Sequence, residues 1–160
     1  MRPLTLIGRA EKVELPQLSA IKVPAKIDTG ADASSIWAHK VEIDGDNLSV
    51  TFFGSESAYY NGQVHTFLPN QYTVTRVSNS FGHREIRYKV KLKIFVKGRL
   101  INGTFTLADR STKLYPILLG RSIIKHKFLV DVTKGSPLFA EEKTRKASLR
   151  EEIIKVRKKS

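Results

Sequence analysis

The chain has 160 residues and no cysteine, and 28 Lys and Arg against 15 Asp and Glu give it a net charge of +13. This length fits one domain with a hydrophobic core plus end segments. The absence of cysteine excludes disulfides, thiolate zinc sites and a cysteine nucleophile. The charge favours a polyanionic partner. We find no signal peptide and no membrane-spanning stretch, so we expect no membrane partner and a cytoplasmic location.

Short apolar runs separated by turn residues predict that most of residues 1–132 forms strands of an all-β barrel or sandwich. The strands expected in the first half are Leu4–Arg9, Val13–Leu15, Ile21–Asp28, Leu48–Phe53, Gln63–Phe67 and Tyr72–Val77. Three dipeptides are typical of two-residue hairpin turns, because such turns need positive φ. They are Asp44-Gly45, Asn61-Gly62 and Asn102-Gly103.

The clearest strand signal runs from Arg84 to Val96, where apolar residues alternate with basic ones. The basic positions are Arg87, Lys89, Lys91 and Lys93. A turn at Lys97-Gly98 would bring Leu100–Ala108 back antiparallel to this strand. Three elements then complete the expected domain: a buried strand, one helical turn and a closing strand. They are Ile117–Leu119, Arg121–His126 and Phe128–Asp131.

The C-terminal part of the chain differs in composition. We divide the chain into a domain over residues 1–135 and a basic, helical extension over residues 136–160. Residues 141–160 hold 8 basic and 4 acidic side chains, so +4 of the net charge lies there and +9 lies on residues 1–140. Ser148 followed by Glu151 is typical of a capping box, which predicts a helix starting there. Its apolar face would comprise Leu149, Ile153 and Val156.

Two short segments carry the chemistry. Asp28-Thr29-Gly30 follows the apolar strand Ile21–Ile27. An Asp at a strand end can project its carboxylate into a cleft, and the nearby Gly allows close approach of backbone. Much later in the chain, Pro116–Leu119 forms an apolar run that leads into Gly120-Arg121.

Together these segments resemble the retropepsins, the retroviral-type aspartic proteases. The chain is still more similar to a bacterial and archaeal family of retropepsin-like proteins, often labelled ATP-dependent zinc proteases. The resemblance covers about Ile7 to Asp131. It rests on Leu15-Pro16, Ala25–Ala31, Val77–Gly82, Leu107–Ser111 and Tyr115–Arg121.

The resemblance implies a closed, barrel-like acid-protease half-domain, with one short helix after the Leu-Leu-Gly-Arg strand and a C-terminal helical tail. It also implies an aspartic endopeptidase. That chemistry needs two neighbouring carboxylates, one ionised and one protonated, because two like charges so close cannot both ionise. The chain has a single Asp-Thr-Gly, so the resemblance implies a homodimer with Asp28 from each subunit.

By the same resemblance, the catalytic residues are Asp28, Thr29 and Gly30, with Thr29 bracing the two loops across the dimer axis. Gly30, Ala31 and Asp32 would line the substrate, and Asp32 would form a structural ion pair with Arg121. A flap over Arg76–Ile86 would close the cleft. Its substrate-binding residues would be Ser78, Asn79, Ser80, Phe81 and Gly82.

The sequence leaves other functions open. A zinc site would need ligands from four scattered histidines that form no His-Glu-x-x-His pair, and there is no phosphate-binding Gly-x-x-x-x-Gly-Lys loop, so we predict no metal and no cofactor. The histidines are His39, His65, His83 and His126.

Binding of a partner is the other class of function. The basic strand face, extended by Lys97 and Arg99, could follow a nucleic-acid backbone. A solvated strand face is favoured, because no aromatic residues interleave with the charges. An acidic peptide steered to the positive surface is a further hypothesis. A non-catalytic, retropepsin-shaped binding module is the main alternative to the enzyme.

Overall fold

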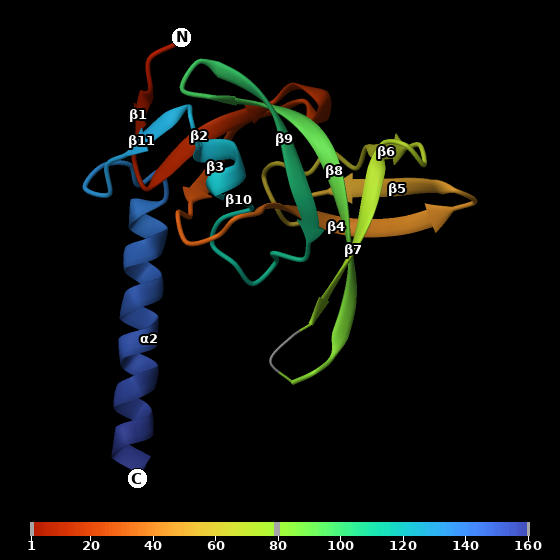
Figure 1. The fold of residues 1–160 in the computed structure, drawn as a ribbon. Coiled ribbons are helices and arrows are strands. Elements are labelled where there is room, and N and C mark those ends of the chain that lie inside the picture. Colours follow the sequence, from red (N-terminus) through yellow and green to blue (C-terminus); the bar gives the residue numbers. More distant parts are fainter. Residues whose placement is uncertain (1, 79–80, 160) are drawn as a thin grey trace.

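The computed structural model describes residues 2–78 and 81–159, and its centre is a closed barrel of six strands (Figure 1). Each strand pairs with the next around the ring, and the last pairs back to the first. In that order the strands are β10 (Ile117–Leu119), β3 (Ala20–Ile27), β2 (Ala10–Leu15), β8 (Arg84–Val96), β9 (Arg99–Ala108) and β4 (Ser34–Asp44). The prediction of an all-β, barrel-like fold is confirmed.

The remaining elements surround this barrel. β5 (Asn47–Phe52) and β6 (Val64–Phe67) extend the sheet beyond β4, and β7 (Tyr72–Ser78) pairs with β8. β1 (Thr5–Ile7) and β11 (Phe128–Val130) form a separate parallel pair. The helical elements are a 3-10 turn η1 (Pro16–Leu18), the short α1 (Arg121–Ile124) and the C-terminal α2 (Phe139–Lys159).

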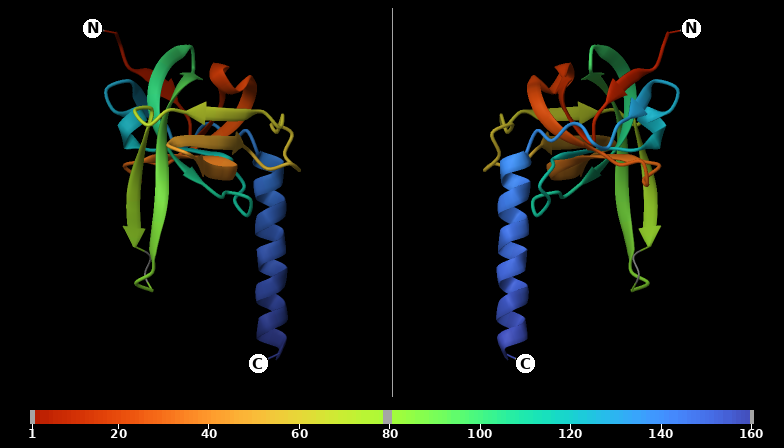
Figure 2. Two further views of the ribbon diagram at one scale, coloured as in Figure 1. Left: turned by 90° about the vertical axis from the view of Figure 1, so that its right-hand side faces the viewer. Right: turned by 90° about the vertical axis from the view of Figure 1, so that its left-hand side faces the viewer.

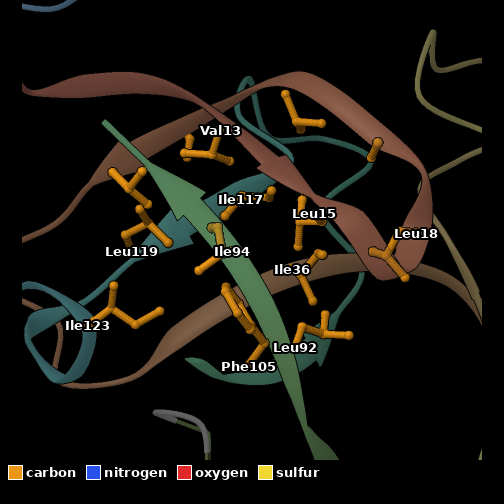
Figure 3. Close-up of a cluster of buried hydrophobic side chains, with 14 of the residues drawn as sticks. Val13, Leu15, Leu18, Ile36, Leu92, Ile94, Phe105, Ile117, Leu119 and Ile123 are labelled. Atoms are coloured by element: carbon orange, nitrogen blue, oxygen red, sulfur yellow. The ribbon is translucent and has the colours of Figure 1, made fainter. Parts of the chain in front are cut away.

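The hydrophobic core fills the barrel, where side chains from opposite strands point toward one another (Figure 3). The predicted alternation of β8 produces this burial from Val90 to Val96. Ile86 belongs to the same apolar series and is nevertheless 56% exposed. The reason is that the first half of β8 leaves the barrel and pairs with β7 as a projecting hairpin.

The turn predictions were right in one case only. Val96 pairs with Arg99, so the β8–β9 turn is Lys97-Gly98, and both residues have positive φ. The β4–β5 turn is shifted by one residue, to Gly45-Asp46. The other two predicted turns are wrong. Asn61-Gly62 lies within the long connection of residues 53–63, and Asn102-Gly103 lies inside β9.

The C-terminal helix is longer than predicted. It starts at Phe139, so Ser148 lies inside the helix and the predicted capping box is wrong. None of its residues is buried. The β7–β8 hairpin and α2 both extend from the same side of the barrel, well apart from each other (Figure 2). Among the described residues, no helix has the length and apolar character needed to cross a membrane.

Candidate active site

Asp28 follows the last residue of β3, and strand pairing brings it next to the second motif. β10 runs parallel to β3, with Leu119 opposite Ile27. The Asp28 amide donates a hydrogen bond of 2.9 Å to the Leu119 carbonyl. The ends of β3 and β10, which are far apart in the sequence, therefore lie side by side at one end of the barrel.

The loop after β3 orients the Asp28 carboxylate. The Gly30 amide donates to Asp28 Oδ1 at 2.9 Å, and the Ala31 amide donates to the Asp28 carbonyl at 3.3 Å. Asp28 is half-buried, whereas Thr29 and Gly30 are exposed. A carboxyl group held by a backbone donor at the open end of a strand can accept a proton from water when it is ionised and can donate a hydrogen bond to a carbonyl when it is protonated.

Gly120 packs directly against this loop. A Cβ at position 120 would lie 2.4 Å from the Ala33 carbonyl oxygen. The Gly120 amide donates to the hydroxyl of buried Ser34 at 2.9 Å, and the Arg121 amide donates to the Ala31 carbonyl at 2.8 Å. The absence of a side chain at Gly120 is what allows the two backbones to approach so closely.

Arg121 contacts the loop through its side chain as well. Its Nη1 donates to the Thr29 carbonyl at 3.0 Å, while its Nη2 lies 4.0 Å from Asp32 Oδ1. Because the Asp32 side chain is 86% exposed, water weakens the attraction between the two charges. The hydrogen bond to Thr29, which the sequence did not predict, is the shorter contact. The structural role of the Asp32–Arg121 pair stays a prediction.

The predicted flap coincides with the projecting hairpin, in which Tyr72–Ser78 pairs residue by residue with Arg84–Val90. Phe81 is 85% exposed, and Gly82 adopts a positive φ of 77°. Asn79 and Ser80, which we predicted to bind substrate, lie outside the described residues. In Figure 1 the two paired strands of this hairpin extend away from the barrel.

A small cavity of about 160 Å³ lies beside the loop, between Asp32 and the outer surface of β8 and β9. Lys89 lines it, so this member of the basic strand face lies next to the candidate site. The cavity is lined by Asp32, Ala33, Lys89, Thr104, Thr106 and Ser122. The alternation along β8 predicted that Lys89 lies on the basic face of the strand. The folded barrel shows that this face lies beside Asp32.

Two cations that we expected to extend this basic face have other roles. Arg99 is buried, and its Nη1 donates to the carbonyls of Pro3 and Lys127 at 3.1 Å each. Lys97 lies 3.9 Å from a Glu11 carboxylate oxygen. Arg99 therefore fastens the N-terminal segment to the chain before β11, and its assignment to the basic face was wrong.

Metal ligands do not gather in the described part of the chain, since no three of its His, Asp and Glu residues are placed to hold an ion together. His65 packs edge-on against Phe52, with ring centroids 5.5 Å apart, and burial lowers its pKa.

Comparison with known proteins adds to this geometry. Residues 6–136 match the RimB-like family, described as retropepsin-like aspartic endopeptidase RimB. The chain belongs to the RimB-like family. The match spans both the Asp28 loop and the strand before Arg121, as well as the hairpin between them.

Relatives of this RimB-like chain include longer proteins. A probable alpha-L-glutamate ligase of Desulfotalea psychrophila is 26% identical over 93% of this chain and 35% of its own length. One of Parasynechococcus marenigrum is 26% identical over 79% of this chain and 28% of its own length. The chain thus spans about a third of the curated relatives that it matches.

A solved structure also resembles the RimB-like chain. It is a Legionella pneumophila protein of unknown function, 26% identical, with a TM-score of 0.61. The similarity covers 81% of this chain and 95% of the Legionella protein.

Proposed function

We propose that this protein is an aspartic endopeptidase whose active site forms when two copies bring their Asp28 carboxylates together. The observation that supports this proposal best is the half-buried Asp28 carboxylate, oriented by the Gly30 amide at the open end of β3. The neighbouring Asp32 is a poor second carboxylate, because it is exposed and lies beside Arg121. A second subunit supplies the missing acid.

In this reaction the ionised carboxylate removes a proton from a water molecule as the water oxygen attacks the peptide carbonyl carbon. The protonated carboxyl group donates a hydrogen bond to the carbonyl oxygen. When the carbon–nitrogen bond breaks, the leaving nitrogen takes up a proton from the dyad. The shared proton belongs to both carboxylates, so their titration describes the pair and not either residue.

Acidic peptide segments are the substrates that we favour. The net charge of +13 raises the local concentration of acidic chains near the protein. The relatives are named probable alpha-L-glutamate ligases, and the matched region is about a third of each. A domain that hydrolyses glutamate-containing peptides would act on the same kind of chain that such a ligase handles.

The test is cleavage of a peptide library that includes glutamate-rich members, with the wild type and with Asp28→Asn, combined with a measurement of mass in solution. Cleavage by a dimeric wild type and none by a dimeric Asp28→Asn protein is the expected result. A non-catalytic binding domain is the second candidate, because the described residues of one chain supply only one suitably placed carboxylate. A dimeric wild type that binds acidic peptides and cleaves none would favour that candidate.

A further inference from the structure

A groove of about 490 Å³ lies between α2 and the barrel, and its lining reaches the end of β3. One wall is formed by residues around the start of β2 and the end of β3, including Ile27, which precedes Asp28. The other wall is α2, and the segment before β10 closes the groove. Its lining includes six basic side chains: Arg9, Lys26, Arg110, Lys113, Arg145 and Lys146.

Only one carboxylate lines the groove, and it already has partners within the protein. Glu142 accepts a short hydrogen bond from the Tyr115 hydroxyl and one of 3.2 Å from Ser136, and it lies 3.6 Å from Arg9. Arg110 is likewise engaged, because its Nε donates to the Tyr115 carbonyl at 2.8 Å.

The other four cations lack such partners. Within residues 2–78 and 81–159, no carboxylate oxygen lies within 4.0 Å of Lys26, Lys113, Arg145 or Lys146. All four are exposed. These positive charges lie around one groove and repel one another, so they raise its positive potential. A bound anionic ligand would offset this repulsion.

The shape and chemistry of the groove favour an acidic peptide over a nucleic acid. Apolar side chains lie among the cations, including Ile27, Leu114 and Leu149, and can contact the aliphatic stems of glutamate. Tyr115 is the one aromatic residue of the lining, and it is buried with its hydroxyl bound to Glu142, so it presents no face for base stacking.

We infer that this groove, which we name the α2 groove, binds an acidic stretch of peptide beside the bond that the Asp28 site cleaves. The part of the inference that concerns cleavage rests on the proposed function. The part that concerns binding rests on the basic side chains that line the groove. α2 acts as the recognition element: Glu142 fastens its first turns to the barrel. Arg145, Lys146 and Leu149 follow on the same side of the helix and line the groove.

Binding is measured on the full chain carrying Asp28→Asn, so that the result does not depend on turnover. The probe is a fluorescein-labelled peptide of consecutive glutamates, followed by fluorescence anisotropy at low and physiological salt. Lys113→Glu with Lys146→Glu should weaken binding at least about tenfold at low salt, with a smaller effect as salt screens the charges. The matched control is Lys155→Glu with Lys158→Glu, which changes net charge equally on the exposed part of α2 outside the groove.

Equal loss in both double variants would overturn the inference, because net charge alone would then account for binding. A single-stranded oligonucleotide that binds more tightly than the peptide, with the same sensitivity to the groove variants, would overturn it in favour of nucleic acid. A change in sedimentation mass with no change in peptide binding would identify the groove as an interface between copies. If the groove variants lose binding as expected while the wild type cleaves no peptide, the binding site stands and the proposed hydrolysis fails.

Discussion

At the scale of single residues, Asp28 differs from the exposed carboxylates because it combines partial burial with a backbone donor. Asp28→Asn keeps the side-chain volume and removes the ionisable group. Because hydrolysis requires one ionised and one protonated carboxyl group, we expect peptide cleavage to fall at least about a thousandfold. Initial rates on the best library peptide measure this.

The control for that experiment is Asp46→Asn, an exposed carboxylate in the β4–β5 turn. Cleavage by this variant should match the wild type, and both variants should unfold near the wild-type temperature. Unchanged cleavage by Asp28→Asn would assign the reaction to other groups.

The substitution Gly120→Ala tests how the packing of Gly120 positions the loop after β3. Its φ is −93°, which any residue adopts, so Gly120→Ala is strained by contact with the Ala33 and Asp32 carbonyls and not by its backbone conformation. We expect a loss of about 1–3 kcal/mol in the free energy of unfolding, as for overpacking of a tight site, measured by urea denaturation. Gly45→Ala is the comparison, since its φ of +61° is strained but a Cβ there meets open space. It should cost about 1 kcal/mol. A larger loss for Gly45→Ala would contradict this account.

His65 should make stability depend on pH. Burial lowers its pKa from 6.5 in the folded protein. As pH falls below 6.5 the unfolded chain binds a proton that the folded protein resists, so stability falls until the pH reaches the folded pKa. His65→Phe should therefore show a smaller drop in melting temperature between pH 7.5 and 5.5, by calorimetry. An unchanged drop would assign the dependence to other groups.

At the scale of elements, the attachment of α2 depends on its first turns. The Tyr115 hydroxyl donates to Glu142, and burial together with this contact raises the Tyr115 pKa. Tyr115→Phe removes the donor, which should cost about 1 kcal/mol and increase hydrogen exchange in the first turns of α2. Tyr60→Phe is the control, because the Tyr60 hydroxyl makes no hydrogen bond with the described residues. Equal exchange in both variants would mean that α2 is held by other contacts.

The long strand β8 was predicted well from its regular pattern, whereas the long strand β4 was missed. β8 was predicted with its observed bounds, because thirteen residues of alternation are a local signal. β4 was not predicted as a strand, although its eleven residues form a wall of the barrel. Its partners include β9 in parallel and β10, which are remote in the sequence, and local propensity does not report such pairing.

At the scale of the whole molecule, the proposed dimer makes a prediction about mixtures. If each active site takes one Asp28 from each of two copies, heterodimers with an Asp28→Asn subunit are inactive. After free exchange of equal amounts of wild type and variant, about a quarter of all dimers are fully wild type by random pairing. Activity per dimer should therefore fall to about a quarter, measured as cleavage rate against mixing ratio. A fall to one half would mean that each chain works alone.

The amino-acid sequence was sufficient to identify the two segments of the candidate site and the all-β class of the fold, because short motifs and strand alternation are local properties of the chain. Which distant residues meet depends on the tertiary fold. The parallel register of β3 and β10 brings Asp28 beside Leu119, and the approach of Gly120 lets Arg121 reach the Thr29 carbonyl. The same folding buries Arg99 and forms the α2 groove. Such contacts depend on strand register and on packing between remote segments, neither of which a local pattern of residues specifies.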